Sequence, residues 1–132
     1  MRRSLICVLC LAAGCATVTA PRVGVTALAS TQYPSRSSDH PVTLFQTQLP
    51  HCAFEEVALV TVRPQTFWTT SEKLVDLLRT NARRLGGDAV IHFKSESTVE
   101  GASPSAGGSI EIDHGLLLSG TVIRFRDPAC TE

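Results

Sequence analysis

The chain has 132 residues, enough for one small domain once any targeting segment is set aside. Its 12 basic and 12 acidic residues balance, so the sequence offers neither a basic surface for nucleic acid nor an acidic tail. Hydrophobic residues make up 43% of the chain, which supports a small core.

The N-terminus has the three-part pattern of an export signal. Arg2 and Arg3 precede an apolar run over residues 5–11, which is followed by the small residues 12–14. The apolar run is shorter than the roughly 20 residues that a membrane-spanning helix needs. We therefore expect a signal peptide over residues 1–14.

Cys15 directly follows the small residues, in the sequence LAAGC. This arrangement resembles the bacterial lipobox, in which a peptidase cleaves before a cysteine that then carries lipid chains, palmitate among them. The alternative is an ordinary secretory signal cleaved near Ala16 or Ala20. Because residues 16–40 are rich in Ser, Thr, Ala and Pro and show no sustained period, we expect residues 15–40 to be a lipidated tether that can extend about 80 Å.

The cysteine count leaves one pair for the exported domain. Cys7 and Cys10 belong to the signal and Cys15 to the lipid anchor, so Cys52 and Cys130 remain. In an oxidising periplasm such a pair predicts a disulfide. Two buried free thiols are the alternative, and a zinc site fits less well because neither cysteine has a second ligand at metal-binding spacing.

Two strands are expected before the first helix. Residues 41–47 form a short β-type run, and residues 57–63 form a better one that Pro64 ends. The second run is apolar on both faces at its start, which favours a central place in a sheet.

A helix is expected over residues 70–85. Thr69 and Glu72 have the spacing of a capping box, and either Gly86 or Gly87 can provide the left-handed exit. Positions that recur at spacings of three and four predict one buried stripe, consisting of Leu74, Leu77, Leu78, Asn81-Ala82 and Leu85.

After the glycines the period changes to two. Over residues 88–95 one face carries Ala89, Ile91 and Phe93 and the other carries Val90, His92 and Lys94. We expect the helix to pack on the first of these faces. The polar, glycine-rich residues 95–115 predict a long hairpin or loop, and residues 116–126 a last strand with a bulge at Gly120.

These elements predict an α+β domain over residues 41–132. One helix packs on a four-stranded mixed or antiparallel sheet, in the chain order strand, strand, helix, strand, strand. If the second and last strands are antiparallel neighbours, Cys52 and Cys130 come within bridging distance. A disulfide there would close a loop of nearly 80 residues and contribute about 4 kcal/mol to stability.

Tyr33-Pro34, residues 54–60 and the helix exit LGGDAVI together resemble a broad group of small bacterial envelope lipoproteins. Their domain is similar to that of the RcsF and YbjQ-like proteins, and the resemblance covers about residues 33–126. It implies this fold, export and a lipid anchor. It also implies sorting to the outer membrane, since Ala16 rather than an aspartate follows Cys15.

We found no serine-nucleophile, phosphate-loop or zinc-protease motif in the sequence, which therefore predicts a non-enzymatic protein without a cofactor. His114 with Glu111 suggests a weak metal site, although a solvated hairpin suits these residues better. His92 and Lys94 are candidate partner contacts.

The helix contributes three further candidate contacts, Arg79, Arg83 and Arg84, whose guanidinium groups suit phosphate or carboxylate partners. The alternative is that they only solvate the helix end and complement its dipole.

The expected function is that of an outer-membrane lipoprotein with a periplasmic interaction or structural module. The expected partners are the membrane, through the N-terminal lipid, and another envelope protein or a cell-wall component, with no nucleic acid. The alternatives are an envelope stress sensor like RcsF and a weak metal-binding protein.

Overall fold

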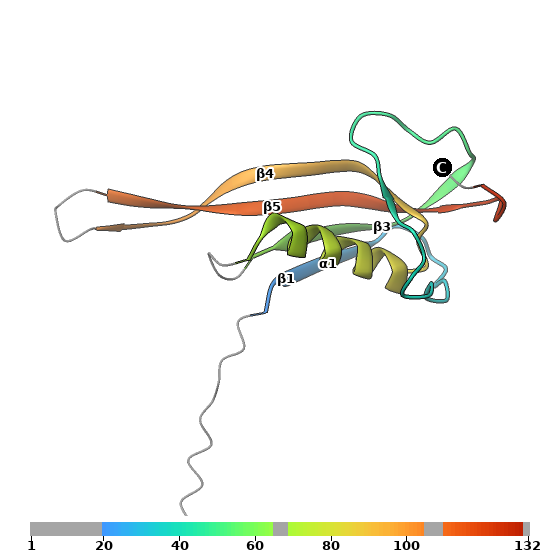
Figure 1. Ribbon diagram of the computed structural model, residues 1–132, viewed down its shortest axis with the longest axis horizontal. Coiled ribbons are helices and arrows are strands. Elements are labelled where there is room, and N and C mark those ends of the chain that lie inside the picture. Colours follow the sequence, from blue (N-terminus) through green and yellow to red (C-terminus); the bar gives the residue numbers. More distant parts are fainter. Residues whose placement is uncertain (1–19, 65–68, 105–109, 131–132) are drawn as a thin grey trace, which may run out of the picture.

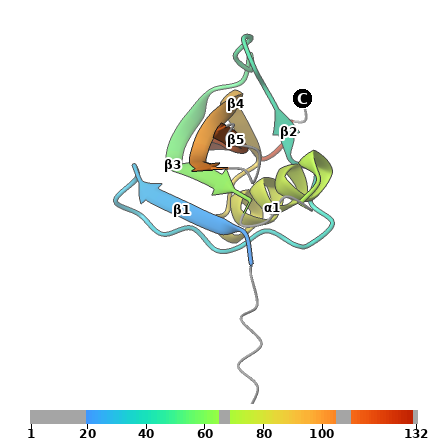
Figure 2. The ribbon, with the colours of Figure 1, turned by 90° about the vertical axis from the view of Figure 1, so that its left-hand side faces the viewer.

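The computed structural model describes residues 20–64, 69–104 and 110–130, with the side chains of residues 98–114 left out. In chain order its elements are β1 (Arg22–Ala27), β2 (Thr43–Leu44), β3 (Phe54–Arg63), α1 (Ser71–Arg84), β4 (Ala89–Pro104) and β5 (Ile110–Phe125). The fold is α+β, with α1 against one face of a mixed sheet (Figures 1 and 2).

The sheet has five strands in the order β1-β3-β5-β4-β2, so the prediction of four strands is wrong. β2 pairs with β4 in parallel, and the other neighbours are antiparallel. The additional strand, β1, lies in the stretch that we expected to be a tether, so residues 22–40 belong to the folded domain. An edge strand has a neighbour on one side only and needs little apolar surface, which explains its weak sequence pattern. Of its residues, Val23 is the one that packs against the core.

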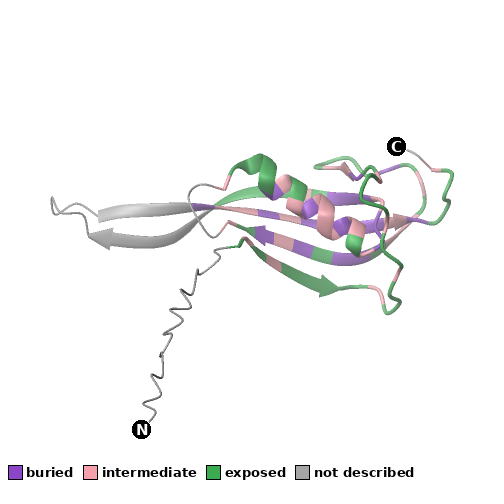
Figure 3. Ribbon diagram, turned by 60° about the horizontal axis from the view of Figure 1, so that its bottom comes forward, coloured by how far each residue is buried: buried purple, intermediate pink, exposed green. Residues whose placement is uncertain are grey.

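The main core lies between α1 and the sheet. The buried stripe of the helix consists of Leu74, Leu78 and Ala82, with Leu77 and Leu85 partly buried beside it. The sheet contributes buried residues from its three central strands, namely Val57, Ala58, Val60 and Val62 of β3, Val90 of β4, and Leu118 and Val122 of β5. Figure 3 shows the buried positions of the helix turned toward the sheet. The predicted helix stripe is therefore confirmed.

The helix begins one residue later than expected. Thr70, rather than Thr69, is the N-cap and accepts a hydrogen bond from the backbone N–H of Lys73 at 3.4 Å. At the other end Gly86 has a φ of 77°, the left-handed exit that the sequence predicted. In the described part of the chain no helix is long and apolar enough to span a bilayer.

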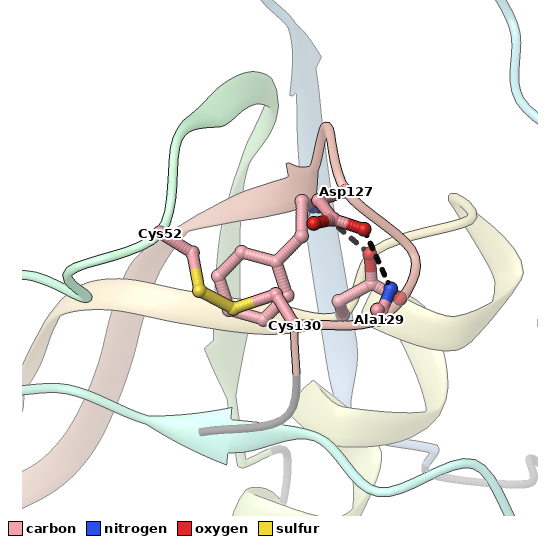
Figure 4. The surroundings of a disulfide bond; sticks show 6 residues. Cys52, Asp127, Ala129 and Cys130 are labelled. Carbon is pink, nitrogen blue, oxygen red and sulfur yellow. Dashed lines mark hydrogen bonds between the residues drawn. A yellow bond between two sulfur atoms is a disulfide. The ribbon is translucent and has the colours of Figure 1, made fainter.

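A second, smaller core covers part of the opposite sheet face. It contains Ala89, Ile91, Ile123 and Phe125, with Phe45, Phe54, Cys52 and Cys130 packed against it. As Figure 4 shows, Cys52 and Cys130 form a disulfide here, with their Cα atoms 6.4 Å apart. The bridge joins the segment before β3 to the segment after β5. These strands are antiparallel neighbours, which is the condition under which the two cysteines were expected to meet.

The prediction that the helix packs on the face of Ala89, Ile91 and Phe93 is wrong, because Ala89 and Ile91 belong to the second core. A bulge also interrupts the alternation of β4 after Ile91. Ile91 pairs with Thr121 and Lys94 with Ser119, so two residues of β4, His92 and Phe93, oppose the single residue Gly120. His92 takes a φ of 53°, and this local turn brings Phe93 to the helix side together with Val90. The helix packs on the face that carries Val90 and Phe93, and Ile91 belongs to the second core.

Gly120 was the expected site of a bulge, but the extra residue lies on the neighbouring strand. A Cβ at Gly120 would collide with Cγ1 of Val90 and approach the carbonyl oxygen of Ile91. Because Gly120 has no side chain, the bulged strand β4 can pack close to β5 at this position.

The stretch expected to be a hairpin or loop belongs to a hairpin, and its two arms are the extended parts of β4 and β5. β3 pairs with β5 as far as Val62 and Leu118, and beyond that point β4 and β5 pair with each other as far as Pro104 and Ile110. Figure 1 shows this two-stranded ribbon extending past the helix.

Candidate functional site

The junction between α1 and β4 is organised around Asp88, whose side chain is 9% exposed. Arg36 Nη2 lies 2.7 Å from Asp88 Oδ1 and donates to Oδ2 at 2.9 Å. His40 Nε2 lies 2.9 Å from Oδ1, and the backbone N–H of Phe125 donates to Oδ2 at 3.0 Å. A single carboxylate therefore fastens the segment before β2 to the sheet.

The segment over residues 33–40 wraps around the end of the helix (Figure 2). The backbone N–H of Arg36 donates to the carbonyl of Arg83 at 2.8 Å, and the Ser35 hydroxyl donates to the carbonyl of Arg84 at 2.9 Å. Arg83 Nε donates to the carbonyl of His40 at 2.7 Å. The segment and the helix terminus thus form one structural unit.

Tyr33 fixes the start of this segment. Its hydroxyl donates to Glu55 Oε2 at 2.6 Å, and the Arg124 guanidinium stacks 4.8 Å from the ring centroid. The hydrogen bond to Glu55 is the main cause of a pKa raised above 10 at Tyr33. A Cβ at Gly86 would lie 2.6 Å from Tyr33 Cβ and 2.7 Å from the carbonyl oxygen of Pro34, so this close approach requires glycine.

A shallow pocket opens where this segment meets the last turns of α1. It is lined by three arginines and two hydroxyl residues, namely Arg36, Arg83, Arg84, Ser38 and Thr80. The pocket lining therefore combines guanidinium donors with neutral hydroxyl groups and contains no carboxylate. Such a lining suits an anion.

The structure separates the three arginines that the sequence singled out. Arg83 and Arg84 line the pocket, whereas Arg79 lies outside it with Nη1 4.0 Å from Asp76 Oδ1. The third pocket arginine, Arg36, was missed because it lies in the stretch expected to be a tether. The nearby Tyr33-Pro34 pair, which belongs to the resemblance described above, was the feature of the sequence that indicated a role for this segment.

A second pocket lies on the other side of Arg36, beside the disulfide. His40, Asp88, Asp127 and Cys130 are among the residues that line it. Asp127 Oδ1 accepts a hydrogen bond from the backbone N–H of Ala129 at 2.9 Å, which shapes the turn leading to Cys130 (Figure 4). Within the ranges whose side chains are placed, no group of three or more His, Cys, Asp or Glu residues could hold a metal ion.

The other predicted contacts lie elsewhere. His92 and Lys94 are exposed at the bulge of β4 and line neither of these pockets. The side chains of Glu111 and His114 lie outside the described residues, as does Cys15.

No protein-family model matches the chain, and no curated protein matches it. Among solved structures the chain is similar to FvfA, a Francisella virulence factor, in its orthorhombic crystal form. The TM-score is 0.50 at 14% sequence identity, and the match covers 82% of this chain and 100% of that one. This likeness concerns the fold alone.

Proposed function

We propose that this protein is a non-enzymatic outer-membrane lipoprotein whose α+β domain is an interaction module on the periplasmic side. The observation that carries the proposal is the position of Cys15, at the end of a lipobox-like motif and seven positions before the first strand. The Cys52–Cys130 disulfide supports it, because structural disulfides persist in an oxidising compartment.

The position of β1 changes the expected geometry of the anchor. A tether reaching residue 40 would extend about 80 Å, whereas the seven positions from Cys15 to Arg22 span at most about 25 Å. A domain anchored through Cys15 would therefore stay close to the membrane surface. Its partners would be membrane proteins or molecules near that surface.

The anchor is tested by changing Cys15→Ser in the full chain, with Cys10→Ser in the apolar run as the matched control. We expect the unaltered chain and the control to fractionate with membranes and to carry a lipid-sized mass increase on the N-terminal peptide. The Cys15 variant should lose that mass increase. Normal processing and lipid mass in the Cys15→Ser variant would exclude lipidation at this residue.

The choice of membrane is tested at the next position. If sorting follows the rule that the resemblance implies, Ala16→Asp should move the protein from the outer-membrane to the inner-membrane fraction of a density gradient, while Ala16→Ser should not. Equal distribution of the two variants would contradict outer-membrane sorting by this residue.

The interaction module is tested by photo-crosslinking in cells from two exposed positions, Lys94 at the bulge and Arg84 at the helix end. A specific envelope protein or cell-wall fragment captured from one position but not from the other is the expected result. The same weak, unspecific pattern from both would count against a docking role for this domain.

A further inference from the structure

We propose that the pocket formed by Arg36, Arg83 and Arg84 with Ser38 and Thr80 is a binding site for a phosphate group. Three guanidinium groups and two hydroxyls come together here from two segments that are about 45 positions apart in the sequence. The site does not depend on the lipid anchor, so it can be tested independently of the proposed function.

The two inner arginines are held in place before any ligand arrives. Arg36 is fixed by its ion pair with Asp88, and Arg83 by the hydrogen bond from Nε to the carbonyl of His40. A guanidinium carries five N–H donors, so both groups keep donors for a ligand. Arg36 Nε is buried and has no hydrogen-bond partner in the described part of the chain. Fixed donors lose little conformational entropy on binding, which favours affinity.

Arg84 completes the site from the exposed side. Its side chain makes no hydrogen bond or ion pair with any residue that the structure describes, whereas its backbone carbonyl accepts from Ser35. Among the described residues, Arg84 is thus a cation without a partner on a fixed backbone, and its guanidinium is available to bind an anion.

The negative end of the helix dipole would normally repel an anion at this place. Here the last four carbonyls, those of residues 81–84, all accept hydrogen bonds. Three of the donors are backbone N–H groups just after the helix, from Leu85 to the Asn81 carbonyl, from Gly86 to the Arg83 carbonyl and from Gly87 to the Ala82 carbonyl. The segment before β2 adds the N–H of Arg36, which donates to the Arg83 carbonyl, and the Ser35 hydroxyl, which donates to the Arg84 carbonyl. These contacts offset the partial negative charge, so the arginines dominate the local potential.

Two nearby carboxylates reduce the positive charge around the pocket. Asp88 neutralises Arg36, and Asp39 has a lowered pKa, caused mainly by a hydrogen bond from Ser37 and to a smaller extent by His40 and Arg83. A phosphate ester has three terminal oxygens and up to two charges, which match three guanidinium groups and two hydroxyls better than the two coplanar oxygens of a carboxylate.

The test is a titration of the isotope-labelled full chain in nonionic detergent micelles, followed by NMR. The ligand is phenyl phosphate, and benzoate is the carboxylate of similar size. We expect saturable shifts of the amide signals of Ser38, Thr80 and Arg84, with benzoate binding at least about fivefold more weakly. Benzoate binding as tightly as phenyl phosphate would overturn the choice of phosphate.

Three exposed or half-exposed positions provide variants that should keep the fold. Arg84→Gln should weaken phenyl phosphate binding about five- to tenfold, the range expected for one charge-assisted contact. Arg79→Gln, on the same helix but outside the pocket, should change affinity less than about twofold. Asp39→Asn should strengthen binding, since it removes a competing negative charge.

An unchanged affinity in Arg84→Gln, or an equal loss in Arg79→Gln, would overturn the site, because binding would then reflect overall charge rather than the pocket. Micelles doped with phosphatidic acid identify the source of the group. Competition with phenyl phosphate would indicate that a lipid headgroup can occupy the pocket, and binding without competition would indicate a soluble phosphate ester.

Discussion

Arg36 Nη2 and Asp88 Oδ1 lie 2.7 Å apart although the two residues are separated by 52 positions in the chain. This ion pair joins the segment before β2 to the residue that precedes β4, and Arg36 lines both the pocket at the helix end and the pocket beside the disulfide. A contact between distant residues therefore helps to hold one arginine of the candidate binding surface in place.

Removing the carboxylate should destabilise the domain. Asp88→Ala leaves Arg36, His40 and the backbone N–H of Phe125 without their acceptor, so we expect a loss of about 2 to 3 kcal/mol in the free energy of unfolding. Urea denaturation followed by circular dichroism measures it. Asp76→Ala is the control, because its pair with Arg79 is exposed and should contribute less than about 1 kcal/mol. Equal losses in the two variants would show that the Asp88 contacts contribute no more than a surface pair.

Gly120→Ala should also destabilise the domain, because the new methyl group meets Val90 and the neighbouring strand backbone. Overpacking of this kind costs about 1 to 3 kcal/mol. Ser119→Ala, on the same strand and half-buried, should stay within about 0.5 kcal/mol. A wild-type melting temperature in Gly120→Ala would show that the bulged strand can move away from β5 at little cost.

The disulfide should be a main contributor to stability. It closes a loop between residues 78 positions apart, for which the chain-entropy model gives about 4 kcal/mol. The double variant Cys52→Ala, Cys130→Ala should lose about that amount, and a reducing agent should bring the unaltered chain to the same level. The reducing agent should not change the stability of the double variant. A loss of stability in that variant would mean that the reducing agent acts on something other than this disulfide.

Tyr33 should titrate above pH 10, and the chain offers a direct measurement because it contains one tyrosine. Absorbance at the tyrosinate band should report an elevated pKa, and Glu55→Gln should bring that pKa back toward 10. The folded-state pKa is raised, so the contribution of Tyr33 to stability is complete below pH 10 and is lost as the pH rises through the folded value.

Tyr33→Phe should accordingly remove this part of the alkaline decrease in melting temperature. A tyrosinate titration at or below pH 10 in the folded chain would contradict the hydrogen bond between Tyr33 and Glu55.

Local sequence patterns predicted the elements that depend on local interactions. The three-and-four spacing of Leu74, Leu78 and Ala82 predicted the buried stripe, and Gly86 the helix exit, because both follow from backbone geometry within a few residues. The positions of Cys52 and Cys130 agreed with β3 and β5 as antiparallel neighbours. The first two inferences depend on residues within a few positions of one another. The third depends on where two cysteines stand relative to the ends of two strands.

Three features could not be predicted from the sequence, because each depends on contacts with residues far away in the chain. β1 is stabilised by pairing with β3, so its own pattern is weak. The bulge at His92 and Phe93, which brings Phe93 to the same side as Val90, forms opposite Gly120 on the neighbouring strand. Arg36 reaches the pocket because Asp88 and the carbonyl of Arg83 hold it there.

By itself, therefore, the sequence determined the α+β class, the helix and its buried stripe, and the expectation of a lipid anchor at Cys15. The tertiary structure decided that Arg22–Ala27 form a strand of the sheet, which face of β4 meets the helix, and which arginines share a pocket. The physical reason is that periodicity and capping act between near neighbours, whereas strand pairing, bulges and ion pairs depend on residues that only folding brings together.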